Sequence, residues 1–487
     1  MELRRFCLIL IILGILVKFY GINDPWKRSD HYNYGGVLTT TYAECLKTTP
    51  LAISKAVPHI DCWKSEPAYY RNHPPTILFG MWAWTSVFGS EEWAYRSFIL
   101  LFSVLNIGLI FLIAKEVRPG TFPYLAAACQ ACFLGNMYFG THPDFIGEFT
   151  VTFLLLGALF ALRKQMWAAC VLGLVAGISA WPGYIFFGPL FIYSLMIKEG
   201  RKRVVAFGAF GVLLAIGTMM WLQQKSDVIE FLMFKIFTPG YLKPERKGWS
   251  EIPQLFKSFF DSQARLMSPL LAGIALYGLF VGLGHSYFKR VNFHNLSKLH
   301  HAVLLSGGTG LLYFILSREY FVIHIFLYLL FTPALALLAA NFLDQWSEGK
   351  LLAPTKSLKR GAIFFVFLSA AVYPFGIYKS NVTLDIVAAI FLTVPALMFL
   401  YLAAKNNLAP KFMKIALSIA VIGNVLELVN YRNEPDRDRS FCRAARAQYG
   451  IDHQSIVTCE LKTPAKELMY CRDLPITYET DPTRCQK

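Results

Sequence analysis

The most informative feature of this sequence is how little charge it carries. Charged residues make up 16% of its 487 residues, whereas soluble proteins usually contain about 25%. Hydrophobic residues make up 55%, which is too large a share for a soluble core. Because spanning helices satisfy their own backbone polar groups, we predict an all-α integral membrane protein. Nearly uncharged stretches close to the roughly 20 residues that cross a bilayer occur at 97–114, 204–222, 270–284, 321–340, 363–378 and 386–404.

Motifs of several other functional classes are missing. The sequence has no phosphate loop, which argues against an ATP-driven pump, and no GxSxG or His-x-x-x-His pattern. It has no internal repeat and no inverted pair of broken segments of the kind that transporters often show. No small-x-small cleavage site follows the first apolar segment, 6–20. We therefore interpret this segment as an uncleaved first helix rather than a signal peptide.

Positive charges concentrate in the short connections between apolar segments. By the positive-inside rule these connections face the cytoplasm. Threading the chain with Met1 inside predicts about thirteen spans and an outer C-terminus. Within 167–197, Trp181, Pro182 and Gly183 interrupt the apolar run, so two short helices are expected to meet there. The basic connections carry Lys115 and Arg118, Arg163 and Lys164, Lys198 and Arg201, Lys289 and Arg290, Lys356 and Arg360, and Lys405 and Lys411.

Three segments assigned to the outside are too long to be turns. They are 21–94, 223–263 and the polar tail 431–487. Loops of this length are uncommon unless they are functional or disordered. We predict a transmembrane domain over 1–430, which carries the first two segments as outer loops, and a small extracytoplasmic tail. The first loop is expected to contain helices around 34–46 and 76–88.

Cysteine placement agrees with this topology. Four cysteines, Cys7, Cys129, Cys132 and Cys170, fall in apolar segments, and none falls in a predicted cytoplasmic connection. An even number remains outside, where disulfides are permitted, so up to three bridges are expected, with unpaired thiols as the alternative. The tail is predicted to be a small disulfide-tied cap. The candidates, whose connectivity is undetermined, are Cys45, Cys62, Cys442, Cys459, Cys471 and Cys485.

Acidic residues mark the outer ends of two predicted spans. Asp30 lies about ten residues beyond the first span, close to the membrane surface, where a carboxylate can act as a general base. Its neighbours Lys27 and Arg28 can meet an anionic lipid phosphate. Asp144 follows the third span, where its alternative role is to cap the next helix. Glu148, one turn further on, is expected within the membrane boundary, where an acid is a functional candidate by default.

Cations and histidines gather at the same predicted face. His73 precedes a Pro-Pro pair, which rigidly starts a helix. Arg96 lies at the mouth of the second span and can pair with an acid or bind phosphate. Arg318 lies at an outer end between later spans, where it can bind a lipid phosphate or only snorkel to the interface. His324 lies about one turn inside the apolar run and needs a partner there.

The order of these features resembles the polyprenyl-phosphate-sugar-dependent glycosyltransferases of the C-type (GT-C) fold. The chain is most similar to family 39, the group of protein O-mannosyltransferases and lipid A aminoarabinose transferases. The resemblance spans roughly 1–340 and is strongest over 30–160. It is carried by an Asp in the first outer loop, by Pro74 and Pro75, by an Asp at the next outer helix start, and by FGSEEWAYRSFILLFSVLNIGLIFLIAKEV, which contains Arg96.

The resemblance implies roles for individual residues. Asp30 matches the catalytic Asp of the family, although His31 follows it where the family often has a second acid. Asp144 matches the Asp of the second outer loop. The stretch REYFVIHIFLYLLFTPALALLAA resembles a late helix of the family, which would bring Arg318 and His324 to the site.

The implied reaction uses a sugar linked to polyprenyl phosphate as the donor. Asp30 would deprotonate the acceptor, which displaces the lipid phosphate with inversion at the sugar carbon. Arg318, Arg96 and the basic second loop would stabilise the departing phosphate. No metal and no cofactor is expected. The partners are the lipid-linked donor and a protein, lipid or glycan acceptor, with no nucleic acid.

The main alternative is a secondary transporter or lipid flippase for an anionic lipid or solute. Transporters place their acids near the midplane of broken helices, whereas Asp30, Asp144, Arg96 and Arg318 gather at one face. This placement favours the transferase. We expect a bacterial inner membrane with the active site facing the periplasm or exterior. The sugar, the acceptor and the oligomeric state are left open by the sequence.

Overall fold

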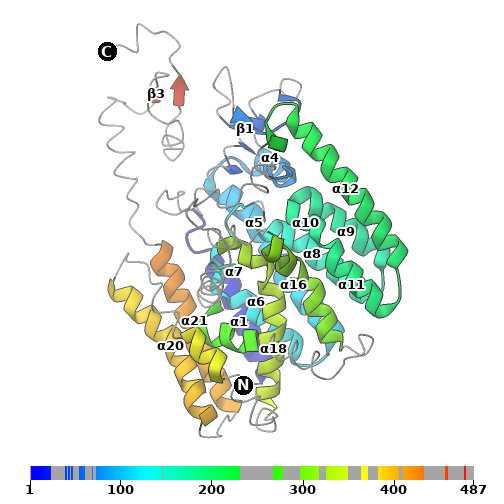
Figure 1. Cartoon of the computed structure of the whole chain (residues 1–487). Helices are drawn as coiled ribbons and strands as arrows, with labels where there is room; N and C mark the ends of the chain where they lie inside the picture. Colours follow the sequence, from blue (N-terminus) through cyan, green and yellow to red (C-terminus); the bar gives the residue numbers. More distant parts are fainter. Residues whose placement is uncertain are drawn as a thin grey trace, which may run out of the picture.

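The protein is described from a computed structural model. The structure describes residues 2–23, 39–40, 42–43, 45–47, 54–60, 68–69, 73–144, 146–230, 267–277, 297–316, 325–348, 363–370, 382–404, 410–432, 456–458 and 476–478. The architecture is helical, as predicted (Figure 1). The described part also contains two pairs of very short strands. Antiparallel β1 (His59–Ile60) and β2 (Ala68–Tyr69) form one pair, and parallel β3 (Ile456–Thr458) and β4 (Ile476–Tyr478) form the other.

The helices follow one another through the apolar segments of the chain. Their bounds are α1 (Leu3–Lys18), α4 (Thr76–Phe88), α5 (Glu92–Val117), α6 (Phe122–Cys132), α7 (Leu134–Phe139), α8 (Glu148–Leu162), α9 (Met166–Ser179), α10 (Trp181–Ile185), α11 (Phe187–Ile197), α12 (Arg201–Gln223), α16 (Lys298–Leu316), the 3-10 helix η3 (Ile325–Leu330), α18 (Thr332–Ser347), α20 (Val382–Ala404) and α21 (Pro410–Arg432). Residues 269–277 and 363–370 are also helical.

Four helices of the described part are long and apolar enough to cross a membrane. They are α5, α12, α16 and the stretch Lys411–Val429 of α21. Most of the apolar surface of α12 is exposed, including Val212, Leu213 and Met220. A contiguous apolar surface of this size is typical of contact with lipid rather than water. The chain is therefore an integral membrane protein, and the predicted number of about thirteen spans stays a prediction.

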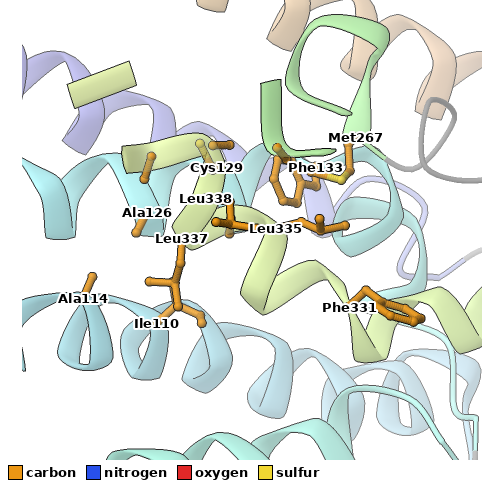
Figure 2. Close-up of a cluster of buried hydrophobic side chains, with 14 of the residues drawn as sticks. Ile110, Ala114, Ala126, Cys129, Phe133, Met267, Phe331, Leu335, Leu337 and Leu338 are labelled. Atoms are coloured by element: carbon orange, nitrogen blue, oxygen red, sulfur yellow. The ribbon is translucent and has the colours of Figure 1, made fainter. Parts of the chain in front are cut away.

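The core lies where α5 and α18 both pack against α6. Figure 2 shows Leu337 and Leu338 of α18 between Ile110 of α5 and Cys129 of α6. The packing is close because α6 is built mostly from alanine and other small residues, which let neighbouring backbones approach in a membrane protein. Helix α1 crosses the same helix so closely that a Cβ on Gly14 would lie 2.6 Å from the carbonyl oxygen of Ala131.

Basic residues from several turns share one end of this bundle. The guanidinium of Arg4 lies over the ring of Tyr124, near the start of α6. Arg118 Nη2 lies 2.7 Å from Asp344 Oδ2 at the end of α18, and Arg163 Nε lies 2.8 Å from Glu116 Oε1. This grouping agrees with the predicted segregation of positive charge to one side of the membrane.

The opposite end carries the short helix α4, which begins and ends where the sequence predicts. Pro75 occupies its N-cap, and the Pro75 carbonyl accepts the backbone N–H of Leu78 at 2.9 Å. The predicted helix start after the two prolines is therefore confirmed. The hydroxyl of Thr76 donates to the carbonyl of Ile178 at the end of α9. This bond joins the start of α4 to the membrane helices.

The predicted break at Trp181, Pro182 and Gly183 is also confirmed. Ala180 is extended, with φ −161° and ψ 149°, and it separates α9 from α10 and α11. The chain turns so tightly here that a Cβ on Gly183 would collide with the carbonyl of Ala176. Figure 1 shows α9, α10, α11 and α12 together on one flank of the bundle, with α20 and α21 on another.

Candidate functional site

Aromatic contacts hold the outer parts of α4, α5 and α8 together. Phe149, the second residue of α8, lies 5.8 Å from Phe98 and 4.7 Å from Phe102 between ring centroids. Trp84 of α4 lies 6.0 Å from the ring of Phe98. Tilted and edge-to-face pairs of this kind add to the stabilisation from burial. The cluster sets the spacing between the helices that carry the candidate residues.

A fully buried lysine lies beneath this cluster. Lys18 is the last residue of α1, and none of it is exposed. Its Nζ donates to Ser103 Oγ at 2.5 Å and to the carbonyl oxygen of Asn136 at 2.6 Å. An ammonium buried in a membrane protein is costly unless it is hydrogen-bonded and paired. The Ser103 hydroxyl that accepts from Lys18 also bonds a carboxylate.

The same network contains the carboxylate of Glu148, the first residue of α8, which is 2% exposed. The Ser103 hydroxyl donates to Glu148 Oε1 at 3.2 Å, and Asn106 Nδ2 donates to Oε2 at 2.6 Å. The Thr152 hydroxyl contacts Asn106 Oδ1 at 2.7 Å and the Glu148 carbonyl oxygen at 2.9 Å. Both carboxylate oxygens thus have partners, and one hydroxyl links the carboxylate to the ammonium of Lys18.

This network lies well below the outer end of α5. Ser103 is eleven residues after Glu92, where α5 begins, which corresponds to roughly 16 Å at 1.5 Å per residue. The prediction that Glu148 lies inside the apolar boundary is consistent with this depth. Its predicted role in substrate binding stays a prediction. Lys18 was missed by the sequence analysis, although a lysine that ends an apolar span is a signal that could have identified it.

Gly140 packs directly on the network. It follows α7 in a right-handed helical conformation, with φ −62° and ψ −3°. An added Cβ would nevertheless collide with the carbonyl oxygen of Asn136 and lie 2.6 Å from Ser103 Oγ and 2.7 Å from Lys18 Nζ. The polar network therefore leaves no room for a side chain at this position.

Gly140→Ala is expected to lower the free energy of unfolding by about 1–3 kcal/mol, the usual cost of overpacking. Thermal unfolding in detergent micelles would measure the change. Gly108→Ala is the matched control, because a Cβ there meets nothing within 4 Å and α5 gains helix propensity of up to about 1 kcal/mol. Equal stability of the two variants would contradict the close contact.

Asp144 lies in the loop between α7 and α8 and is partly exposed. Its Oδ1 accepts the backbone N–H of Ile146 at 3.4 Å, and its carbonyl accepts that of Gly147 at 3.3 Å. Helix α8 begins at Glu148, with Gly147 at the N-cap and no side-chain cap. The alternative role of Asp144 as a helix cap is therefore wrong, because the helix starts four residues later. The first-turn acid of α8 is Glu148.

The same loop holds a buried histidine that the sequence analysis did not select. His142 is 4% exposed, and its ring stacks on Tyr138 with 4.3 Å between centroids. Its Nδ1 lies 2.7 Å from the Tyr138 carbonyl oxygen. A histidine two residues before a candidate acid was the available signal. These contacts attach the first half of the loop to α7.

Two further candidates lie at the starts of helices. Arg96 is 4% exposed and lies one turn into α5. It is seven residues before Ser103 and so on the same helix face, about 10 Å nearer the outer end. His73 is partly buried directly before the Pro-Pro pair. Arg96 thus stands above the network that contains Glu148.

The remaining candidates of the sequence analysis lie outside the described residues, so their roles stay predictions. They are Asp30, Lys27, Arg28, Arg318 and His324. Among the described residues, no group of three or more His, Cys, Asp or Glu side chains is arranged to hold a metal ion.

The described cysteines fall into two kinds. Those of the apolar helices are free and buried, in agreement with the sequence analysis: Cys7, Cys129, Cys132 and Cys170. Cys45 is disulfide-bonded, with a partner beyond the described residues. The disulfides of the predicted tail stay a prediction, because its cysteines, like Cys62, lie outside the described part.

Comparison with known proteins gives a family match and a fold match. Residues 72–222 match the family described as dolichyl-phosphate-mannose-protein mannosyltransferase. Crystal structures of ArnT from Cupriavidus metallidurans are similar over nearly the whole chain. The apo structure has a TM-score of 0.57 at 17% identity and covers 98% of this chain and 86% of that one. This chain has the GT-C fold. The recognition drawn from the sequence is confirmed at this level.

A second ArnT structure, bound to undecaprenyl phosphate, gives the same result. Its TM-score is 0.58 at 16% identity, and the match covers 98% of this chain and 87% of that chain. Comparison with curated protein sequences gives no match. The family match contains Arg96, Asp144 and Glu148, whereas Lys18 precedes it. In this GT-C chain the outer parts of α4, α5 and α8 therefore belong to the segment with the family signal.

Proposed function

We propose that the protein transfers a sugar from a polyprenyl-phosphate donor to an acceptor on the extracytoplasmic side of the membrane. The observation that supports this most directly is the GT-C fold, which extends over 98% of the chain and is shared with an ArnT structure that contains undecaprenyl phosphate. The mannosyltransferase family match over 72–222 supports the same reaction class. We place the protein in a bacterial inner membrane with the site facing the periplasm.

In the proposed reaction, Asp30 is the general base. Its carboxylate takes the proton from an acceptor hydroxyl or amine, and the acceptor atom then attacks the anomeric carbon of the sugar. The bond between this carbon and the phosphate oxygen breaks with inversion, and polyprenyl phosphate leaves with the negative charge. Arg96 and Arg318 stabilise that charge as it develops, while Asp144 helps to orient the acceptor. No metal takes part in the proposal.

The test uses the full-length protein reconstituted in nanodiscs. Undecaprenyl and dolichyl phosphates that carry mannose, glucose or aminoarabinose are supplied as donors, together with peptide and lipid acceptors. We expect at least one donor to release free polyprenyl phosphate in step with glycosylated acceptor. A lipid flippase would instead bind or move these donors without breaking the sugar–phosphate bond. That outcome with every donor would overturn the proposal.

Arg96→Gln is expected to raise the KM for the donor by about tenfold or more. A hydrogen bond to a charged group contributes about 1.5–3 kcal/mol, and about 1.4 kcal/mol corresponds to a factor of ten. The measurement is the initial rate against donor concentration. Arg118→Gln is the matched control, because Arg118 pairs with Asp344 at the other end of the bundle. The same rise in KM for both variants would count against a phosphate-binding role for Arg96.

A further inference from the structure

Lys18 and Glu148 join parts of the chain that are far apart in sequence. Ser103, which receives the bond from Lys18, is 85 residues away, and Asn136 is 118 residues away. The network therefore fastens the outer end of α1 to α5, to α7 and to the first residue of α8. Each of these contacts involves a buried polar group, so none can be released without leaving a donor or acceptor unsatisfied.

The loop that carries Asp144 is attached to this network at both ends. At one end Gly140 packs against Lys18 Nζ and Ser103 Oγ with no room for a Cβ. At the other end Gly147 is the N-cap of α8, and Glu148 follows it directly. Asp144 lies midway between these two fixed points. Its backbone is further held by the bond from Gly147 N–H to its carbonyl.

Opposite charges make this attachment specific. The Ser103 hydroxyl accepts a hydrogen bond from the ammonium of Lys18 and donates one to the carboxylate of Glu148. The hydroxyl proton therefore points toward the carboxylate. Without the ammonium, the Ser103 hydroxyl loses a donor and the Glu148 carboxylate loses the cation that this hydroxyl links to it. Glu148 would then relax toward other donors, and the start of α8 would move with it.

We infer that Lys18 is a positioning residue for sugar transfer: with Glu148, and through Ser103, it holds the loop from Gly140 to Gly147 so that Asp144 faces the reacting groups. The role given to Asp144 rests on the proposed function. The coupling between Lys18 and Glu148 is independent of that function.

The first test is a kinetic double-mutant cycle with Lys18→Met, Asp144→Asn and the double variant. Release of undecaprenyl phosphate from undecaprenyl-phosphate mannose or undecaprenyl-phosphate aminoarabinose gives the rates. Lys18→Met is expected to lower kcat by about 10- to 100-fold through misplacement of the loop, with the donor KM within about twofold of wild type. If Lys18 acts through Asp144, the double variant is no slower than Asp144→Asn alone. Losses that multiply would overturn the inference.

The second test keeps the inference falsifiable if Lys18→Met folds poorly. Lys18→Met, Glu148→Gln and the double variant are compared by thermal unfolding in detergent. Both residues bond the same Ser103 hydroxyl, so we expect the double variant to lose less stability than the sum of the two single losses. Destabilisations that simply add would show that the two residues are not coupled, and would overturn the inference. Lys202→Met, which removes an exposed lysine of α12, is the control and should change neither rate nor stability.

The two tests separate the two proposals. If the wild-type protein turns over no donor, the proposed function fails, while the unfolding cycle still decides whether Lys18 and Glu148 are coupled. If donors are turned over and the rate losses of Lys18→Met and Asp144→Asn multiply, the function stands and the positioning role fails.

Discussion

Replacing Asp30 with asparagine is expected to slow sugar transfer by about 10²- to 10⁴-fold, the range that a positioned general base typically contributes. Asparagine keeps the size of the side chain but cannot take the acceptor proton. The donor KM is therefore expected to stay close to that of the wild type, and the loss should appear in kcat. The measurement is the rate of polyprenyl phosphate release at saturating donor, with membrane insertion verified separately.

Asp24→Asn is the matched control for this experiment, because it makes the same chemical change six residues earlier in the same outer segment. It is expected to leave the rate unchanged. If Asp30→Asn inserted normally and transferred sugar at the wild-type rate, the assignment of Asp30 as base would be wrong. Equal losses in both variants would point to a general effect on the segment rather than to base catalysis.

Glu148→Ala is expected to lower the free energy of unfolding by about 1–3 kcal/mol, the usual cost of leaving a buried hydrogen-bonding group without a partner. The change removes the carboxylate that Ser103 links to the buried Lys18, and Asn106 Nδ2 loses the acceptor that lies 2.6 Å away. Denaturant titration in micelles would measure this loss. The expected effect is larger than at an exposed site because water cannot reach these buried donors to replace the lost carboxylate.

Glu116→Ala is the control, because it makes the same chemical change at an exposed site. Glu116 pairs with Arg163 at 2.8 Å, but both side chains are about one-third to two-fifths exposed, at 34% and 41%. Exposed pairs of this kind contribute about 1 kcal/mol or less. A similar loss of stability in both variants would show that burial does not govern the strength of the Glu148 contacts.

Local features of the helices were predictable because their causes are local. Proline at an N-cap has no N–H to satisfy and a restricted φ, so Pro75 marks the start of α4 wherever the chain folds. The break at Ala180 has the same origin, since Pro182 lies in the first turn of the next helix, two residues later. The low charge of the apolar segments likewise indicates that they lie in lipid, whichever helices pack beside them.

The alternative role of Asp144 as a helix cap was wrong because the start of α8 depends on distant contacts. Asp144 and Glu148 are one helical turn apart, and both suit the first turn of a helix. The helix begins at Glu148, where bonds from Ser103 and Asn106 of α5 hold the carboxylate. Neither donor is near Glu148 in sequence, so no local pattern could select between the two acids.

The sequence by itself determined that this protein lies in a membrane and where helices begin at prolines. These follow from composition and from the geometry of single residues. Only the tertiary structure decided that Lys18, Ser103 and Glu148 form one network beneath the loop of Asp144. The physical reason is that a buried charge takes its partners from whichever helices pack around it, and here Lys18 bonds residues that are 85 and 118 positions away along the chain.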